Sequence, residues 1–167
     1  MNTRTEVDAM FSARPTTLQD LPIPAPRQAA PPDTIETRLW VDEHDWLYSL
    51  LRSEANVSPT FRFPDLISAC VSLVFEGDCA APRIFRFLST ELVLRPANTM
   101  RRRETMWRAQ YDLLLALQRS PANRHPNPKF QLDQLTTACV ALDRKADASG
   151  ADVLRQARIN IALRASQ

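Results

Sequence analysis

The sequence predicts a mainly α-helical protein with a short two-stranded antiparallel ribbon, built from two copies of one strand-helix-helix-helix unit. Two segments of the chain match each other at a nearly constant offset, which indicates an internal duplication. One segment alternates apolar and polar residues with the period of a strand. Later segments place apolar residues three and four positions apart, as on one helix face. We expect residues 35–98 and 99–167 to form the two units of one compact, pseudo-symmetric domain.

A Pro-rich arm precedes both units. Residues 1–34 contain six of the thirteen prolines and no sustained apolar period. This composition predicts a flexible, disordered arm. Within it, Leu21–Pro26 has proline at every second position, and it either forms a polyproline segment that docks on a partner protein or belongs to a plain tether.

The duplication rests on two aligned segments. At an offset of 67 residues, 40–56 lies over 107–123 with eight identities in seventeen positions. A two-residue insertion changes the offset to 69, and 61–73 then lies over 130–142 with six identities in thirteen positions. Chance gives roughly one or two matches over such a length, so a repeat is the better explanation. The same offset places Arg95 over Arg164.

The first unit begins with a predicted strand. Ile35–Val41 has Ile, Thr, Leu and Val at alternate positions, which is the pattern of a half-buried strand. Asp42 is the candidate N-cap of a helix that we expect to end near Asn56. The matching strand of the second unit, Arg103–Arg108, alternates less clearly, and this segment either forms a strand or extends the following helix.

Two amphipathic helices follow in each unit, after a loop that contains Pro59 in the first. The second helix has one apolar face, which gives its cysteine the role of a small hydrophobic residue. A third helix is expected from about Arg83 to Leu94, and a corresponding last helix is expected after Gly150. The apolar face comprises Leu66, Ala69, Cys70, Leu73 and Val74 in the first copy and Leu135, Ala138, Cys139 and Leu142 in the second.

Composition excludes several classes of protein. The three cysteines form no Cys-x-x-Cys pair and have no histidine at ligand spacing, so we expect neither zinc, nor a disulfide framework, nor another cofactor. The apolar runs are too short to span a bilayer, and no secretory pattern begins the chain, which predicts a cytoplasmic protein without membrane contact. His44, expected on an exposed helix surface, and His125, in a Pro-rich loop, have no catalytic partners, so an enzyme is not expected.

Positive charge is concentrated in the second half of the chain. The formal charge is +2 overall, but it is −3 over residues 35–98 and +6 over residues 99–167. Nearly all basic residues are arginines, which suits forked recognition of phosphate or guanine but also follows from a GC-rich coding sequence. Composition alone therefore identifies no partner.

The order of a short strand, a capped helix, a brief turn and a second amphipathic helix, with Thr37–Val41 just before the first helix, resembles the ribbon-helix-helix DNA-binding family. That unit works as a dimer because one strand needs a second strand as its partner. Two fused units after a Pro-rich arm are similar to the accessory proteins that enhance T-DNA transfer from Ti plasmids. The extra third helices and the absence of Ser-x-Ser at the second helix start depart from the general family pattern.

The resemblance implies that an intramolecular ribbon enters the major groove of double-stranded DNA and presents outward side chains to the bases. The arginine run before the second strand suits phosphate attraction, and backbone amides at the start of each second helix suit a phosphate clamp. The two tryptophans either contact DNA or cover the junction between ribbon and helix. The candidate residues are Arg38, Trp40, Arg101, Arg102, Arg103, Thr105 and Trp107 on the ribbon and Thr60, Arg62 and Lys129 at the helix starts.

Two functions remain open at this point. The first is sequence-selective DNA binding, by an accessory of conjugation or by a transcriptional repressor, with DNA-transfer or partition proteins as partners of the Pro-rich arm. The second is a non-enzymatic adaptor that uses the duplicated helices and the arm to bind other proteins. Either is expected to act as a pseudo-dimeric monomer or as a higher oligomer.

Overall fold

The computed structural model describes residues 33–57, 60–124 and 128–167, all of which belong to the unit Pro32–Gln167. Most of the predicted arm, its docking segment Leu21–Pro26 and His125 lie outside these residues. The arm was predicted to extend to residue 34, but Thr34 is the first residue of the first strand. The elements follow the order β1 (Thr34–Trp40), α1 (Val41–Leu51), α2 (Phe63–Phe75), α3 (Ala80–Thr90), the 3-10 turn η2 (Leu92–Leu94), β2 (Arg101–Trp107), α4 (Arg108–Arg119), the 3-10 turn η3 (Pro121–Asn123), α5 (Leu132–Ala146) and α6 (Ala151–Ala165). A mainly α fold with a short ribbon is therefore confirmed.

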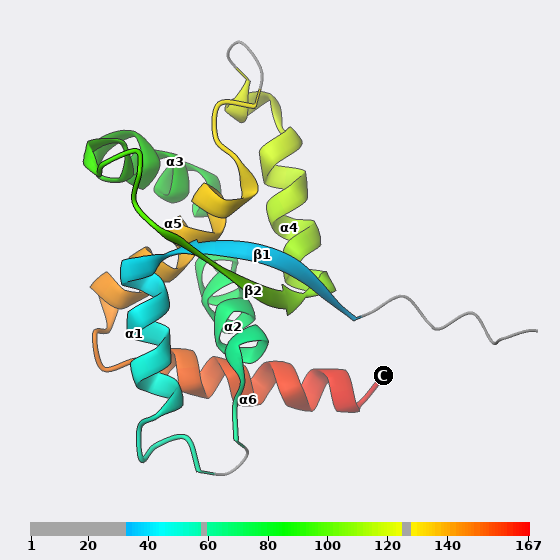
Figure 1. Cartoon of the computed structure of the whole chain (residues 1–167). Coiled ribbons are helices and arrows are strands. Elements are labelled where there is room, and N and C mark those ends of the chain that lie inside the picture. The colour runs from blue at the N-terminus through cyan, green and yellow to red at the C-terminus, as the bar shows by residue number, and fades with distance from the viewer. Residues whose placement is uncertain (1–32, 58–59, 125–127) are drawn as a thin grey trace, which may run out of the picture. The chain divides into compact units, whose positions relative to one another are not determined.

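The two strands form an antiparallel ribbon with Thr37 of β1 opposite Glu104 of β2 at its centre. Backbone hydrogen bonds continue the ribbon beyond both ends. The amide of Val41 donates to the carbonyl of Met100 over 2.9 Å, and a corresponding bond of 2.8 Å joins Arg108 to Asp33. Two segments that lie far apart in the sequence are thus fixed side by side, as Figure 1 shows.

The first strand lies within one residue of its predicted position, and of the two alternatives for the second segment the structure shows the strand. Val41 and Arg108, which we expected to end the strands, are instead the first residues of α1 and α4. The prediction that Asp42 caps the first helix is wrong. Trp40 occupies the N-cap position without a side-chain hydrogen bond, and Asp42 lies in the first helical turn.

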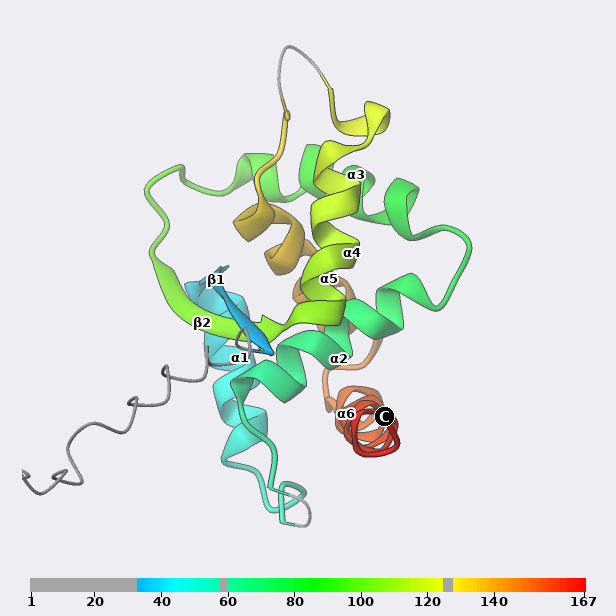
Figure 2. The same cartoon turned by 90° about the vertical axis from the view of Figure 1, so that its right-hand side faces the viewer.

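Helices α2 and α5 cover one face of the ribbon. Helix α5 packs against β1, α2 packs against β2, and the two helices also contact each other. Leu39 and Met106 point from the ribbon into this layer and are fully buried. Helix α6 lies against α2 and α3 lies against α5, so the ribbon stays at the margin of the helices in Figure 2.

The predicted apolar faces of the second helices form the centre of the core. Cys70 of α2 and Cys139 of α5 are fully buried free thiols, in the small hydrophobic role that the spacing predicted. Most of their helix neighbours on the same faces are also buried, and Leu73 and Leu142 are partly buried against the core.

The prediction that α1 continues to near Asn56 is wrong, because α1 ends at Leu51 and Asn56 organises the loop that follows. Its Nδ2 donates to the carbonyls of Leu51 and Phe61, and its Oδ1 accepts from the Phe61 amide over 2.6 Å. Asn123, its match at an offset of 67, makes the same three kinds of bond in the loop before α5. A buried amide side chain fully hydrogen-bonded in this way fixes the path of each loop.

The third helices differ slightly from the expected bounds. Helix α3 begins before Arg83 and ends at Thr90, so that Leu94 falls in η2. Helix α6 begins directly after Gly150, as predicted. Gly150 has a φ of +72°, the left-handed conformation that glycine adopts at little cost.

The expectation that His44 is exposed on a helix surface is wrong. Its side chain is only 15% exposed, and its Nε2 lies 2.8 Å from Oε1 of Glu104 on β2. The imidazole also stacks on Phe63 with ring centroids 4.6 Å apart. His44 therefore joins α1 to the helix-facing side of the ribbon.

Candidate nucleic-acid interface

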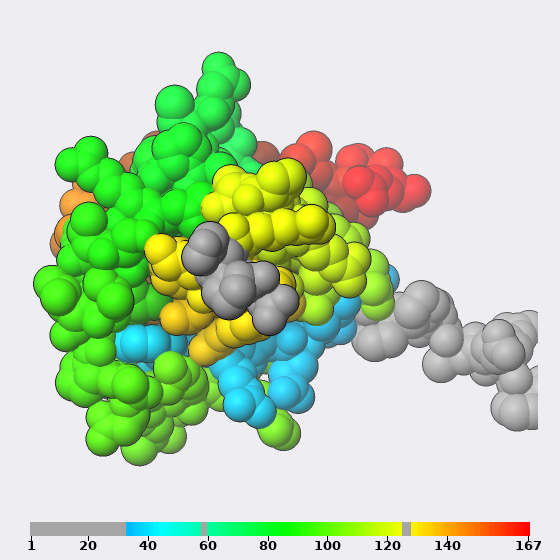
Figure 3. Space-filling view, turned by 90° about the horizontal axis from the view of Figure 1, so that it is seen from above, coloured from blue at the N-terminus to red at the C-terminus, as the bar shows by residue number. Residues whose placement is uncertain are grey.

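One face of the ribbon is not covered by helices and carries polar side chains. Alternation along the strands places Glu36 and Arg38 of β1 and Arg103 and Thr105 of β2 on this outer face. The register sets Arg38 opposite Arg103 and Glu36 opposite Thr105. In the space-filling view of Figure 3, atoms of β1 in blue and of the start of β2 in green reach the surface along one edge.

Next to the ribbon centre, this face has an unusual pairing of two like charges. Arg38 and Arg103 are both exposed and lie directly opposite each other, an arrangement that is unfavourable for like charges in a sheet. Arg103 is balanced by Glu36, whose Oε1 lies 3.1 Å from its Nε. Arg38 forms no ion pair with any residue that the structure describes. The outer face therefore holds one paired and one unpaired guanidinium.

The predicted arginine run divides into three different environments. Arg103 faces outward with its side chain 70% exposed. Arg102 is also exposed, but the register puts it opposite Leu39, on the helix-facing side of the ribbon edge. Arg101 points back towards the protein. The run is thus not a continuous basic strip, because adjacent strand residues point to opposite faces.

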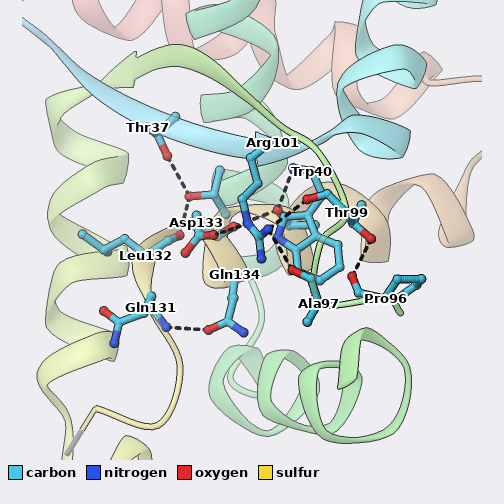
Figure 4. Close-up of polar contacts among 12 residues, drawn as sticks. Thr37, Trp40, Pro96, Ala97, Thr99, Arg101, Gln131, Leu132, Asp133 and Gln134 are labelled. Carbon is cyan, nitrogen blue, oxygen red and sulfur yellow. Dashed lines mark hydrogen bonds and ion pairs between the residues drawn. The ribbon is translucent and has the colours of Figure 1, made fainter. Parts of the chain in front are cut away.

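Arg101 is held by several acceptors at one end of the ribbon, as Figure 4 shows. Its Nε lies 3.2 Å from Oδ2 of Asp133 at the start of α5, and its Nη1 donates to the carbonyls of Ala97 and Thr99. The guanidinium also lies 4.6 Å from the centroid of the Trp40 ring. A phosphate contact by Arg101, as predicted, requires it to leave these partners.

Trp40 covers the junction between ribbon and helix, which was one of the two predicted roles. It is only 3% exposed and lies between Arg101 and Arg95, so its ring is not available to bases. Its amide donates to Oγ1 of Thr137. Its indole Nε1 is buried without a hydrogen-bond partner in the described part of the chain.

Trp107 has the corresponding place at the other end of the ribbon, with a better-satisfied side chain. Its amide donates to Oγ of Ser68, and its Nε1 donates to Oδ1 of Asp65 over 2.9 Å. Arg164 of α6 lies 3.9 Å from the ring centroid and also donates to Asp65. Trp107 therefore links β2, α2 and α6. Arg164 covers one face of its ring, so that face is not available for the predicted DNA contact.

The predicted phosphate clamp at the helix starts needs correction. The side chains of Thr60, Arg62 and Lys129 are exposed, as a phosphate contact requires. Most of the backbone amides proposed for the clamp, however, already donate to acceptors within the protein and are not free for a phosphate. The amides engaged in this way are those of Phe61, Arg62, Lys129, Phe130 and Gln131.

A groove of about 400 Å3 runs beside the ribbon at the start of α5. Arg38 and Arg101 line it from the ribbon, Tyr111 and Gln118 line it from α4, and Asp133 lines it from α5. Glu36 lines it as well, and Arg101 is ion-paired with Asp133, so the unpaired Arg38 lies in a groove whose charged side chains balance.

Several residues that shape this surface were missed from the sequence. Asp65 and Arg164 contact Trp107, and Asp133 binds Arg101, but each lies 32 or more residues away from its partner in the chain. Ser68 and Thr137 accept hydrogen bonds from the tryptophan backbone amides, and these two residues do occupy matching positions at an offset of 69. Matched hydroxyl residues on the second helices were the one available signal.

Within the described ranges, no group of three or more His, Cys, Asp or Glu residues is placed to hold a metal ion. Nor does any helix in this part of the chain have the length and apolar character needed to cross a membrane.

Comparison with known proteins gives no further assignment. No family model, no curated protein and no solved structure matches this chain.

Proposed function

We propose that this protein binds double-stranded DNA by inserting the β1–β2 ribbon into the major groove. The observation that supports this most directly is the exposed outer face, on which Arg38 lies opposite Arg103 next to the ribbon centre. Two like charges opposite each other are a cost to the free protein, whereas guanine acceptors and phosphates offset that cost. The major groove is wide enough to admit a two-stranded ribbon.

The proposal includes a tandem ribbon-helix-helix architecture in which one chain supplies both halves of a pseudo-dimer. Matched residues make matched contacts, which supports this view. Asn56 and Asn123 hold equivalent loops, and Ser68 and Thr137 accept the amides of Trp107 and Trp40 across the two halves. Each strand then packs on the second helix of the other half, as an intertwined pair requires.

The bound site should be asymmetric. On one side of the ribbon centre the outer pair is Arg38 with Arg103, and on the other side it is Glu36 with Thr105. Arg38 is the residue best placed to donate two hydrogen bonds to guanine, a contact that discriminates against other bases by about 1–3 kcal/mol. Such a surface suits either an accessory of DNA transfer or a repressor, because the two share one binding chemistry.

Fluorescence anisotropy with fluorescent duplexes across a salt series tests the proposal. Wild-type protein should bind with micromolar affinity or tighter, and the affinity should fall steeply as salt rises. The double variant R38A/R103A should bind at least about tenfold more weakly, because each arginine supplies a charge and base contacts.

The matched control is R86A/R155A, which removes two exposed arginines from α3 and α6 instead of the ribbon. An equal loss in both double variants contradicts ribbon insertion and leaves only a general charge effect. If wild-type protein binds no duplex at low salt, DNA binding is wrong, and an adaptor built from the duplicated helices becomes the alternative to test.

A further inference from the structure

Glu36 is a carboxylate on the surface that we propose for DNA. Its side chain is 54% exposed on the outer face of β1, next to Arg38 in the outward series. A carboxylate there repels phosphates and lowers the sequence-independent attraction to any duplex. Its position therefore needs a role other than simple affinity.

Its contacts supply such a role. Oε1 of Glu36 lies 3.1 Å from Nε of Arg103 on the neighbouring strand, so the carboxylate neutralises one of the two central guanidiniums. The residue directly opposite Glu36 is Thr105, which brings no charge. Arg38 has no carboxylate partner among the described residues. Only one of the two arginines is thus masked in the free protein.

We infer that Glu36 is a specificity-determining residue, which masks Arg103 on non-cognate DNA and releases it only when bases replace both partners of the pair. This inference rests on the proposed DNA binding. Releasing Arg103 without loss requires an amino donor for the carboxylate, such as cytosine N4, and acceptors for the guanidinium, such as guanine O6 and N7. On any other sequence the Glu36–Arg103 ion pair either stays intact or separates without new hydrogen bonds that offset its loss.

The consequence is a lower affinity for DNA in general together with a greater discrimination between DNA sequences. Arg38 remains free to attract every duplex, whereas Arg103 contributes fully only on a matching site. Because the pair is exposed and solvent-screened, each effect should be modest. Removing the carboxylate should therefore tighten binding to random DNA by about twofold to fivefold and narrow the ratio between selected and random sites.

The experiment uses the full chain and two probes, a short duplex pool of randomised sequence and the duplex that wild-type protein selects from that pool. E36Q removes the charge and keeps the shape. E54Q is the matched control, because Glu54 is exposed and belongs to the segment after the end of α1, which lies away from the ribbon in Figure 1. R103A and E36Q/R103A complete a double-mutant cycle, which isolates the coupling between the two residues.

E36Q should bind the random pool more tightly than E54Q and discriminate less between selected and random duplexes. The loss of discrimination should largely disappear when Arg103 is alanine, whereas the tighter binding that comes from the lost phosphate repulsion should remain. If E36Q and E54Q behave alike while wild-type protein still binds the selected duplex, the inference is wrong and DNA binding stands. If E36Q narrows the affinity ratio between selected and random duplexes equally when Arg103 is alanine, the inference that Glu36 masks Arg103 is wrong. Absence of wild-type binding to both probes instead overturns the proposed function itself.

Discussion

Thr37 of β1 lies directly opposite Glu104 of β2, and 67 residues, the offset of the first aligned segment, separate the two positions. The centre of the ribbon thus pairs a position with its own match, while the side chains differ. Thr37 shares a hydrogen bond of 3.1 Å with Thr136, whereas Glu104 lies 2.8 Å from His44. The two positions therefore share one backbone pairing but have different polar partners on the helix-facing side of the ribbon.

Replacing Asp65 with alanine should lower the free energy of unfolding by about 3 kcal/mol, a typical cost of breaking a buried ion pair from one side. Asp65 is 5% exposed and accepts from the Trp107 indole, Arg164 and the amide of Arg62. Urea denaturation measures the effect. The matched control is Q134A, because Gln134 occupies the equivalent position and accepts only from the Gln131 amide within the described chain. Equal losses in the two variants contradict this account.

The hydrogen bonds that the two buried asparagines make to their loops should contribute measurably to the free energy of unfolding. N56A and N123A should each cost about 1–3 kcal/mol, because each leaves buried backbone groups without partners. Asn56 is 9% exposed and Asn123 is 1% exposed. N98A, at an exposed asparagine in the connection to β2, is the control and should change stability by less than about 0.5 kcal/mol. Thermal and urea unfolding of the three variants should give this order, and a loss in N98A as large as in the others refutes it.

The two glycines should respond differently to alanine. At Gly150 a φ of +72° is unfavourable for any residue with a Cβ, and that Cβ would lie 2.5 Å from the Leu50 side chain. G150A should therefore cost about 2 kcal/mol. At Gly77 an added Cβ meets nothing within 4 Å, so G77A should be nearly neutral. Chemical denaturation of both variants checks the contrast, and a neutral G150A refutes it.

The sequence predicted those parts of the fold that depend on local pattern. Alternation predicted the first strand to within one residue but left the second segment open between a strand and a helix extension, and helical spacing identified the buried faces around Cys70 and Cys139. The site was predicted less completely. Arg38 and Arg103 lie on the outer face as strand alternation requires, but Trp40 and Arg101 are held by partners that periodicity does not reveal.

The missed contacts have a common physical origin. The bond between His44 and Glu104 joins the two halves of the chain, and the bond between Arg101 and Asp133 joins a strand to a helix 32 residues further along the second half. Such contacts depend on how different elements pack together, and neither composition nor spacing within one element encodes that arrangement. The engaged amides at the helix starts were missed for a similar reason, since Asn56 had been assigned to a helix rather than to the loop.

A buried carboxyl in the core should make stability depend on pH. Burial raises the pKa of Asp143 on α5 to about 7. The hydrogen bond from the Cys70 thiol of α2 and the charge of Arg83 on α3 lower this pKa by smaller amounts. The charges of Asp152 on α6 and Glu76 after α2 raise it slightly. Its Oδ2 has no hydrogen-bond partner among the described residues.

The sign follows from proton binding in the two states. In the unfolded chain an aspartate has a pKa of about 3.9, so between pH 4 and 7 the folded state holds a proton that the unfolded state has released. Asp143 therefore lowers the free energy of unfolding progressively as pH rises through this range, by at most about 4 kcal/mol, with little further change above pH 7. The variant D143N keeps the shape and removes the titration, so wild-type protein should lose stability relative to D143N as pH rises from 4 to 7. Urea denaturation across that range measures the difference, with D112N on the exposed surface of α4 as the control. A difference between wild type and D143N that stays constant over the whole range contradicts a buried, protonated Asp143.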